Sequence, residues 1–234
     1  LQALTSWLKR LRRIVRLPNM DTPDDTLEER RPEDVFLVSY PRSGNTWMRY
    51  LLANLLIPEV AWNIENLRRA VPDIHEGLPP DLLQDNPRII KSHRPYREEY
   101  PRVIYIYRDG RDVALSLYDY RKKLRGYEHD FMTFLEDMLE GRLPYGSWQE
   151  HVKSWLFQEN AQTVLPVQYE ALCADTKAEM QRVADFFGRN WTDENLENAI
   201  SKSRFSKVQK DYKNHNRETH WEKGFKGGVH GGPG

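Results

Sequence analysis

Short apolar runs alternate with longer amphipathic stretches along most of this chain, and this alternation constrains its fold more than any other feature. The apolar runs cover residues 35–39, 88–91, 102–107 and 164–168. Each run is short and bounded by polar or turn-forming residues, which is typical of buried strands. The stretches at 46–56, 111–124, 131–139, 148–160 and 177–187 predict helices. Strands alternating with helices predict an α/β fold of three layers, in which helices cover both faces of a parallel sheet.

The composition limits the class of protein. The chain has 234 residues, which suits one folded domain, and no apolar run approaches the roughly 18 residues that a membrane span needs. Lysine plus arginine equals aspartate plus glutamate at 35 each, so the chain lacks the basic excess of a dedicated nucleic-acid binder. Cys173 is the only cysteine, which excludes an intrachain disulfide and predicts a reducing, cytoplasmic compartment.

We expect two parts along the chain: a basic amphipathic leader and linker at 1–32, and one domain at 33–234. In the first 17 residues, leucines and a valine fall on one helical face and basic residues occupy much of the rest. This pattern is typical either of a membrane-surface or targeting helix or of a helix that lies on the domain, and the sequence leaves both open. The chain begins at Leu1 rather than methionine, so we expect a fragment or a trimmed form of a longer protein.

The turn after the first predicted strand has the features of an anion site. Residues 40–47 read Tyr-Pro-Arg-Ser-Gly-Asn-Thr-Trp. Gly44 allows a tight turn, and the amides that follow it would point from a helix N-terminus towards an anion. Hydroxyls of Ser43 and Thr46 and the charge of Arg42 add donors. The loop is not a Walker A motif, because the lysine after its last glycine is absent.

Two further segments follow predicted strands and carry chemistry. Residues 108–116 read Arg-Asp-Gly-Arg-Asp-Val-Ala-Leu-Ser and open a helix that would bring Ser116 beside a phosphate held by Arg108. Lys91 and His93 lie at the end of the second strand. A histidine near neutral pH can accept a proton from a hydroxyl, so His93 is a candidate general base.

These segments resemble those of the cytosolic-type sulfotransferases, which use 3′-phosphoadenosine 5′-phosphosulfate (PAPS). The family's 5′-phosphosulfate loop is usually Tyr-Pro-Lys-Ser-Gly-Thr-Thr-Trp, its 3′-phosphate segment Arg-Asn-Pro-Lys-Asp-Val-Ala-Val-Ser, and its base lies in Lys-Thr-His. Further matches are Tyr-Gly-Ser-Trp at 145–148, with His151 and Val152 after it, and Tyr-Glu at 169–170. Ser-Arg-Phe at 203–205 is similar to the family's Thr-Ser-Phe. Because the matches keep their order and spacing over 35–205, chance is a poor explanation.

The resemblance implies a fold like that of P-loop nucleoside triphosphate hydrolases and a transfer of the sulfuryl group from PAPS to an acceptor hydroxyl, leaving adenosine 3′,5′-bisphosphate (PAP). His93 would be the base, with Arg42 and Lys91 stabilising the sulfuryl oxygens and the leaving phosphate. Ser116 would hold the 3′-phosphate and orient Arg42. The nucleotide-binding positions would be Arg42, Ser43, Gly44, Asn45, Thr46, Trp47, Arg108, Ser116, Tyr169, Ser203 and Phe205. We expect no metal.

The chain departs from the family pattern at two places. Arg42 replaces a lysine; it keeps the charge but cannot donate a proton at neutral pH. The family closes over the nucleotide with Arg-Lys-Gly-x-x-Gly-x-Trp, and here two registers compete, Glu222-Lys223-Gly224 and Lys226-Gly227-Gly228. We prefer Lys226, Gly227 and Gly228, because this register places no acidic side chain against a phosphate. No tryptophan follows, so this glycine-rich lid is incomplete.

The sequence leaves the acceptor and two rival functions open. A small molecule, a saccharide or an acyl chain on a carrier protein could supply the hydroxyl, and a carrier protein or neighbouring domain could be a partner. Several aromatic side chains could line an acceptor pocket or belong to the core: Trp62, Tyr96, Tyr118, Tyr120 and Phe134. The rival functions are a nucleotide-dependent kinase and a non-catalytic nucleotide-binding module.

Overall fold

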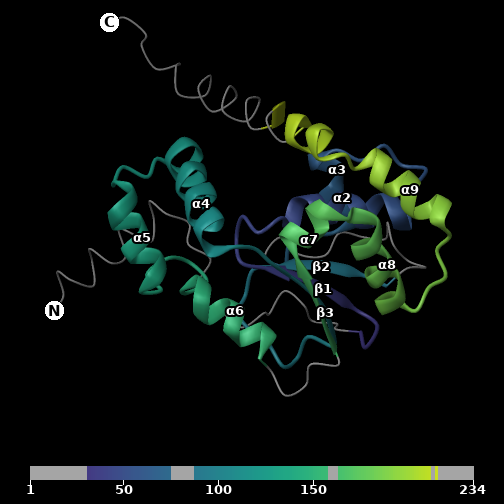
Figure 1. The fold of residues 1–234 in the computed structure, drawn as a ribbon, viewed down its shortest axis with the longest axis horizontal. Coiled ribbons are helices and arrows are strands. Elements are labelled where there is room, and N and C mark those ends of the chain that lie inside the picture. Colours follow the sequence, from purple (N-terminus) through teal and green to yellow (C-terminus); the bar gives the residue numbers. More distant parts are fainter. Residues whose placement is uncertain (1–30, 75–86, 158–162, 212–213, 216–234) are drawn as a thin grey trace, which may run out of the picture.

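A computed structural model of the chain describes residues 31–74, 87–157, 163–211 and 214–215. Its centre is one sheet of four strands, β1 (Val35–Ser39), β2 (Ile89–Ser92), β3 (Arg102–Tyr107) and β4 (Val164–Gln168). The strand order is β2-β1-β3-β4, and every neighbouring pair is parallel (Figure 1). The four predicted strands and the predicted parallel α/β architecture are therefore confirmed.

Helices cover both faces of the sheet, as the continuous apolar strands require. On one face, Val35 and Leu37 of β1 pack with α2 (Asn45–Leu56), α8 (Thr176–Phe187) and α9 (Asp193–Lys202). On the other face, Phe36 and Val38 pack in a cluster with Trp155 of α6 (Trp148–Leu156). The alternate side chains of one strand thus enter two separate cores, which makes the three layers.

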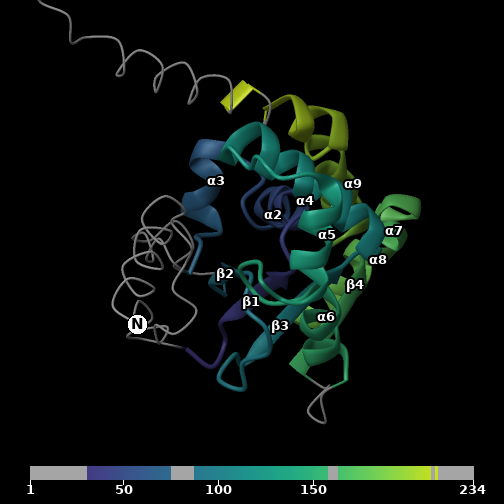
Figure 2. The ribbon, with the colours of Figure 1, turned by 90° about the vertical axis from the view of Figure 1, so that its left-hand side faces the viewer.

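A further hydrophobic cluster lies next to the carboxyl end of β1. It joins Tyr40 to apolar residues of α4 (Gly110–Arg125) and α5 (Phe131–Leu139). Figure 2 views the molecule from the side on which these two helices lie. Phe134 is fully buried in this cluster and Trp62 is buried in the core around α2, so these two aromatics belong to the core.

The helices differ from the predicted set in four places. The structure adds α3 (Ile64–Ala70), α7 (Tyr169–Ala174) and α9, which the sequence pattern did not predict. α3 and α9 each begin with a capping box, Asn63 with Asn66 and Thr192 with Asn195. The prediction for α6 was too long, because this helix ends at Leu156.

Some predictions fall outside the described residues. They concern residues 1–30 of the expected leader and linker at 1–32, and the lid register at Lys226, Gly227 and Gly228. Among the residues that are described, no helix is long and apolar enough to span a bilayer.

A buried ion pair fixes the start of β1. The carboxylate of Asp34 is fully buried and accepts two hydrogen bonds from the guanidinium of Arg88, at 2.7 and 2.6 Å. It also accepts the backbone N–H of Arg31 at 2.9 Å. Loss of one member of such a pair leaves the other charge uncompensated, which is far more costly than loss of an exposed pair.

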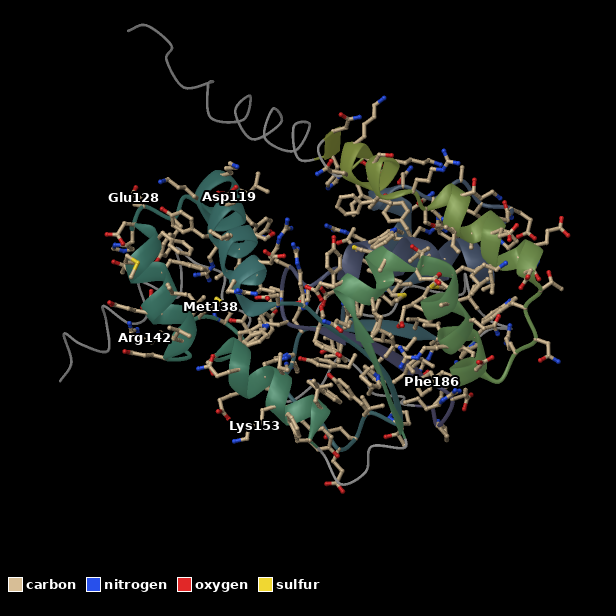
Figure 3. All side chains as sticks on the ribbon, in the orientation of Figure 1. Asp119, Glu128, Met138, Arg142, Lys153 and Phe186 are labelled. Carbon is tan, nitrogen blue, oxygen red and sulfur yellow. The ribbon has the colours of Figure 1, made fainter. Side chains whose placement is uncertain are left out.

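We therefore expect Asp34→Ala to lower the free energy of unfolding by about 3 kcal/mol or more. Asp119→Ala is the matched control, because Asp119 forms an ion pair with Lys123 on the exposed surface of α4 (Figure 3). Loss of this exposed pair should lower the free energy of unfolding by less than about 1 kcal/mol. Urea denaturation of both variants measures the difference. Equal losses would show that the Asp34–Arg88 pair does not anchor the strand.

Candidate active site

The carboxyl ends of the strands bring the predicted site residues to one edge of the sheet. The turn at 40–44 follows β1, His93 follows β2, Arg108 follows β3 and Tyr169 follows β4. In the order β2-β1-β3-β4, the chain moves from β1 to one side and returns to the other, so β1 lies at a topological switch point. Parallel α/β sheets bind ligands at such points.

The turn between β1 and α2 has a backbone that few sequences adopt. Gly44 has φ +106°, and a Cβ there would lie 2.5 Å from the Tyr169 ring. Arg42 also has a positive φ, 72°, which is uncommon for a residue with a side chain. Gly44 provides no side-chain cap for α2, so within the described part of the chain no side chain caps the first-turn N–H groups of this helix. The turn is a strained cradle with helix donors at its base, which is the arrangement that favours an anion.

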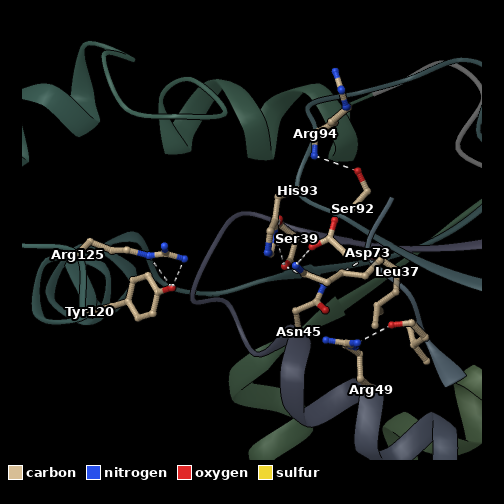
Figure 4. Close-up of polar contacts among 12 residues, drawn as sticks. Leu37, Ser39, Asn45, Arg49, Asp73, Ser92, His93, Arg94, Tyr120 and Arg125 are labelled. Carbon is tan, nitrogen blue, oxygen red and sulfur yellow. Dashed lines mark hydrogen bonds and ion pairs between the residues drawn. The ribbon is translucent and has the colours of Figure 1, made fainter. Parts of the chain in front are cut away.

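The side chains of Ser43 and Asn45 differ in their hydrogen bonding. Ser43 is fully buried, and its Oγ has no hydrogen-bond partner among the described residues. The Asn45 amide nitrogen instead donates to Leu37 O at 3.3 Å and to Ser39 Oγ at 3.2 Å (Figure 4). The side chain of Asn45 therefore ties α2 to β1, and only its backbone N–H joins the donors of the turn.

Arg42 contacts the helix that follows β3. Its Nε donates to Ser116 Oγ at 3.1 Å, and its guanidinium lies 5.1 Å from the centre of the Tyr120 ring. Arg125 donates to the hydroxyl of Tyr120 at 3.1 and 3.3 Å (Figure 4). These contacts join the turn after β1 to α4 and concentrate positive charge between them.

Arg108 is placed between a carboxylate and an aromatic ring. It donates to Asp112 at 3.1 Å, and its guanidinium lies 4.5 Å from the centre of the Tyr169 ring. Its Nε is buried and has no hydrogen-bond partner among the described residues. A buried guanidinium N–H without an acceptor is a feature that a bound anion would satisfy. Arg111, three residues on, is instead exposed and paired with Asp109.

Three aromatic side chains gather beside the turn. Trp47 packs edge-on against Tyr169 at 6.2 Å and against Phe205 at 5.7 Å, as measured between ring centres. The indole N–H of Trp47 donates to Ser203 O at 2.8 Å, and the hydroxyl of Ser203 accepts a hydrogen bond from Asn54 at 3.0 Å. Phe205 is 47% exposed, so part of this aromatic surface faces solvent.

His93 is fixed by the end of β1. Its Nδ1 lies 2.7 Å from Ser39 O (Figure 4). Because a carbonyl oxygen can only accept, Nδ1 carries the proton, and the neutral ring has its lone pair at Nε2. Burial, and then the charge of Lys91, lower the pKa of His93 to about 3. The ring is therefore neutral at physiological pH and presents a proton acceptor.

Lys91 has an acidic partner that the sequence analysis did not identify. Its ammonium forms an ion pair with Asp73, and backbone hydrogen bonds join Lys91 to Pro72 and Ile74 on each side of that residue. The carboxylate of Asp73 also acts on His93, whose pKa it raises against the larger effect of burial. The ring of Tyr145, at a positive φ of 74°, lies 5.6 Å from that of His93.

The arrangement combines a strained anion cradle, a buried guanidinium and a neutral histidine at one edge of a parallel sheet. These parts suit transfer of an anionic group, with positive charge to neutralise it and a base to receive a proton. Among the described residues no group of three or more histidine, cysteine or acidic side chains is placed to hold a metal ion.

The chain resembles sulfotransferases in sequence over most of its length. The sulfotransferase domain family matches residues 32–231. Sulfotransferase 2B1 of Mus musculus is 32% identical over 193 residues, which are 76% of this chain and 57% of that protein. Sulfotransferase 1A1 of Bos taurus is 31% identical over 201 residues, which are 77% of this chain and 67% of that protein.

Solved structures give the same result for the fold. Mouse sulfotransferase SULT7A1, solved as a complex with PAP, is similar with a TM-score of 0.61 and 25% identity, covering 77% of this chain and 67% of its own. Retinol dehydratase, solved with androsterone and PAP, has a TM-score of 0.65 over 86% of this chain and 70% of its own; at 22% identity this likeness concerns the fold alone.

The chain therefore belongs to the sulfotransferase domain family, and its fold is that of the family. It spans 57% and 67% of the two curated relatives.

The state of His93 can be tested without any ligand. We expect ¹⁵N NMR of the histidine rings to show His93 with a proton on Nδ1 and none on Nε2, and no titration of this ring between about pH 5 and pH 8. The reason is that its pKa is held near 3, so the ring stays neutral throughout this range. A midpoint near the ordinary histidine value, or a proton on Nε2, would contradict the geometry at Ser39.

Proposed function

We propose that the protein transfers a sulfuryl group from PAPS to an acceptor hydroxyl, with His93 as the general base. The observation that carries this proposal is the hydrogen bond from His93 Nδ1 to Ser39 O. It holds the ring at Ser39, the residue where β1 enters the anion cradle, and leaves the lone pair on Nε2. A base and an anion site that share the end of one strand are what an attack by a hydroxyl on a bound anionic group requires.

The residues present fit the nucleotide. Ser43 Oγ and Arg108 Nε are buried donors without partners among the described residues, and the absence of a Cβ at Gly44 lets the Tyr169 ring pack directly against the turn. The 5′-phosphosulfate would lie at the turn of 42–47, and the 3′-phosphate between Arg108 and Ser116. Trp47, Tyr169 and Phe205 would contact the adenine. The lid residues Lys226, Gly227 and Gly228 would close over the 3′-phosphate.

The chemistry follows from the charges of these side chains. PAPS supplies the activated sulfuryl group, and the hydroxyl proton of the acceptor passes to Nε2 of His93. Arg42 and Lys91 neutralise the negative charge that develops on the sulfuryl and phosphate oxygens. Arg42 keeps its proton at neutral pH, so it acts through charge and not as an acid. Asp73 holds Lys91 in place on the side of the sheet that carries His93.

The proposal specifies the acceptor only as a compound that carries a hydroxyl group. A small molecule, a saccharide or an acyl chain on a carrier protein would each supply the attacking oxygen. The retinol dehydratase of similar fold was solved with androsterone, a ligand of that protein. PAPS turnover measured across a panel of phenols, sterols, sugars and acyl carriers would identify the acceptor class.

Loss of His93 should affect turnover and spare nucleotide binding. We expect His93→Ala to lower kcat by about 10²-fold or more, as removal of a general base does, with PAP affinity nearly unchanged. His129→Ala is the matched control, because His129 is exposed in the connection between α4 and α5. Steady-state assays with PAPS and calorimetric titration with PAP separate the two effects. Full turnover in His93→Ala would remove this residue from the mechanism.

Arg108 should recognise the 3′-phosphate specifically. A hydrogen bond to a charged group contributes about 1.5–3 kcal/mol, so we expect Arg108→Ala to weaken PAP binding by about 10-fold or more. Binding of adenosine 5′-phosphate, which lacks the 3′-phosphate, should change much less. Arg111→Ala is the control, because Arg111 lies three residues further on, in the first turn of α4, and is exposed and paired with Asp109. If Arg108→Ala weakens both nucleotides equally, Arg108 is only a structural corner residue.

The choice of nucleotide distinguishes a sulfotransferase from a kinase. A ligand that binds the folded state raises its stability by about 2.7 kcal/mol at a hundredfold excess over Kd. PAP should therefore raise the melting temperature, and a chelator should not remove this effect. ATP with magnesium should raise it much less, because the turn at 40–47 has no Walker lysine for a γ-phosphate. A larger shift with ATP and magnesium than with PAP would contradict the proposal.

A further inference from the structure

A second histidine, His151, is buried in contact with the backbone of the proposed base, His93. His151 of α6 is 1% exposed, and its ring packs edge-on against Tyr40 at 5.4 Å between ring centres. The mechanism proposed above gives it no role. A buried imidazole is costly to place unless its nitrogens have hydrogen-bond partners, so the partners of His151 indicate what it does.

The tautomer of His151 follows from its two partners. Its Nε2 lies 3.1 Å from the backbone carbonyl of His93, which can only accept, so Nε2 carries the proton. Its Nδ1 lies 3.0 Å from the hydroxyl of Tyr105. Burial lowers the pKa of His151 to about 4, and it raises the pKa of Tyr105 far above the ordinary range. The ring is thus neutral and the phenol protonated, so Tyr105 donates to Nδ1.

The result is a directed chain of hydrogen bonds that ends on the peptide of His93. Tyr105 O–H donates to His151, and His151 N–H donates to the carbonyl of His93. Four residues further along α6, the indole N–H of Trp155 donates to the carbonyl of Arg94 at 3.0 Å. α6 therefore holds two consecutive carbonyls of the segment that follows β2. β1 holds the ring of His93 from its other side, through Ser39 O.

We propose that His151 is a positioning residue for His93, and that Tyr105 fixes the tautomer in which His151 can act. This inference rests on the proposed role of His93 as the base. The peptide carbonyl and the imidazole of His93 are each held by one hydrogen bond from a different element. Release of the carbonyl lets the backbone rotate and moves Nε2 away from the acceptor. Small displacements of a base lower turnover without changing the binding of the nucleotide.

The first test removes one hydroxyl. Tyr105→Phe keeps the ring in the core but leaves His151 without the donor that selects its tautomer. We expect kcat to fall by about 3-fold or more, with the KM for PAPS unchanged. Tyr107→Phe is the matched control, because it makes the same change two residues along β3, and its ring stacks on that of Tyr105 at 6.5 Å between centres. Equal kcat values for the two variants would overturn the proposal.

The second test compares two substitutions of His151, each of which keeps an amide nitrogen near the place of one ring nitrogen. The amide nitrogen of a glutamine reaches about as far as Nε2 and can still donate to the His93 carbonyl, whereas an asparagine reaches only to the position of Nδ1. We expect His151→Asn to lower kcat by about 10-fold or more and His151→Gln to stay within about 3-fold of wild type. PAP affinity should be equal in both. A fall of the same size in both, or a parallel loss of PAP affinity, would mean that His151 only packs the core.

A spectroscopic measurement tests the positioning role of His151 independently of the proposed sulfuryl transfer. In wild type and in Tyr105→Phe, ¹⁵N NMR reports the tautomers of His93 and His151 without any substrate. We expect Tyr105→Phe to shift the His151 ring signals and to weaken the bond between His93 Nδ1 and Ser39 O, with Tyr107→Phe as wild type. If wild type does not turn over PAPS but these shifts occur, the proposed function fails and the positioning stands. Unchanged signals in Tyr105→Phe would overturn the positioning.

Discussion

The carbonyl and hydroxyl of Ser39, at the last residue of β1, are the constraint on which the site depends. The carbonyl accepts from His93 Nδ1, and the hydroxyl accepts from the Asn45 amide. One bond fixes the segment after β2, and the other fixes the first residue of α2. The strained turn at 40–44 connects Ser39 to Asn45, and the hydrogen bond between these two side chains holds its two ends together. The proposed base and the anion cradle are therefore placed relative to each other by a single strand end.

β1, β2 and β3 were predictable because most of their residues are buried in unbroken runs, whereas in β4 only Val167 is buried. Each residue of β1 is fully buried, and such a run appears in the sequence as an unbroken apolar stretch. The three missed helices have weaker local signals. α7 begins at Tyr169, directly after the last residue of β4, without a turn residue to separate them. α3 and α9 begin with capping boxes that use asparagine at the third helical position, where glutamate or glutamine is the usual signature.

The candidate site was predictable only where its residues follow a strand. His93, Arg108 and Tyr169 each come directly after a strand and Arg42 lies in the turn that follows β1, and a parallel sheet brings such positions to the same edge. Asp73, Tyr105 and His151 were not assigned a role, since each acts through a partner distant in sequence. Asp73 lies 18 residues from Lys91, and His151 lies 46 residues from Tyr105 and 58 from His93. No local pattern encodes these contacts, because they arise from the packing of α6 and the 73–74 segment against the sheet.

The low pKa of His93 bears on its proposed role as the base. A general base works best when its pKa lies near the working pH, and burial together with Lys91 holds His93 well below that. Negative charge brought close to an imidazole raises its pKa, as Asp73 already does here. An anionic group held at the turn of 40–47 would act in the same direction and would offset the charge of Lys91. Under the proposed function, a bound donor would therefore raise the pKa of His93, and proton acceptance would be coupled to occupation of the anion cradle.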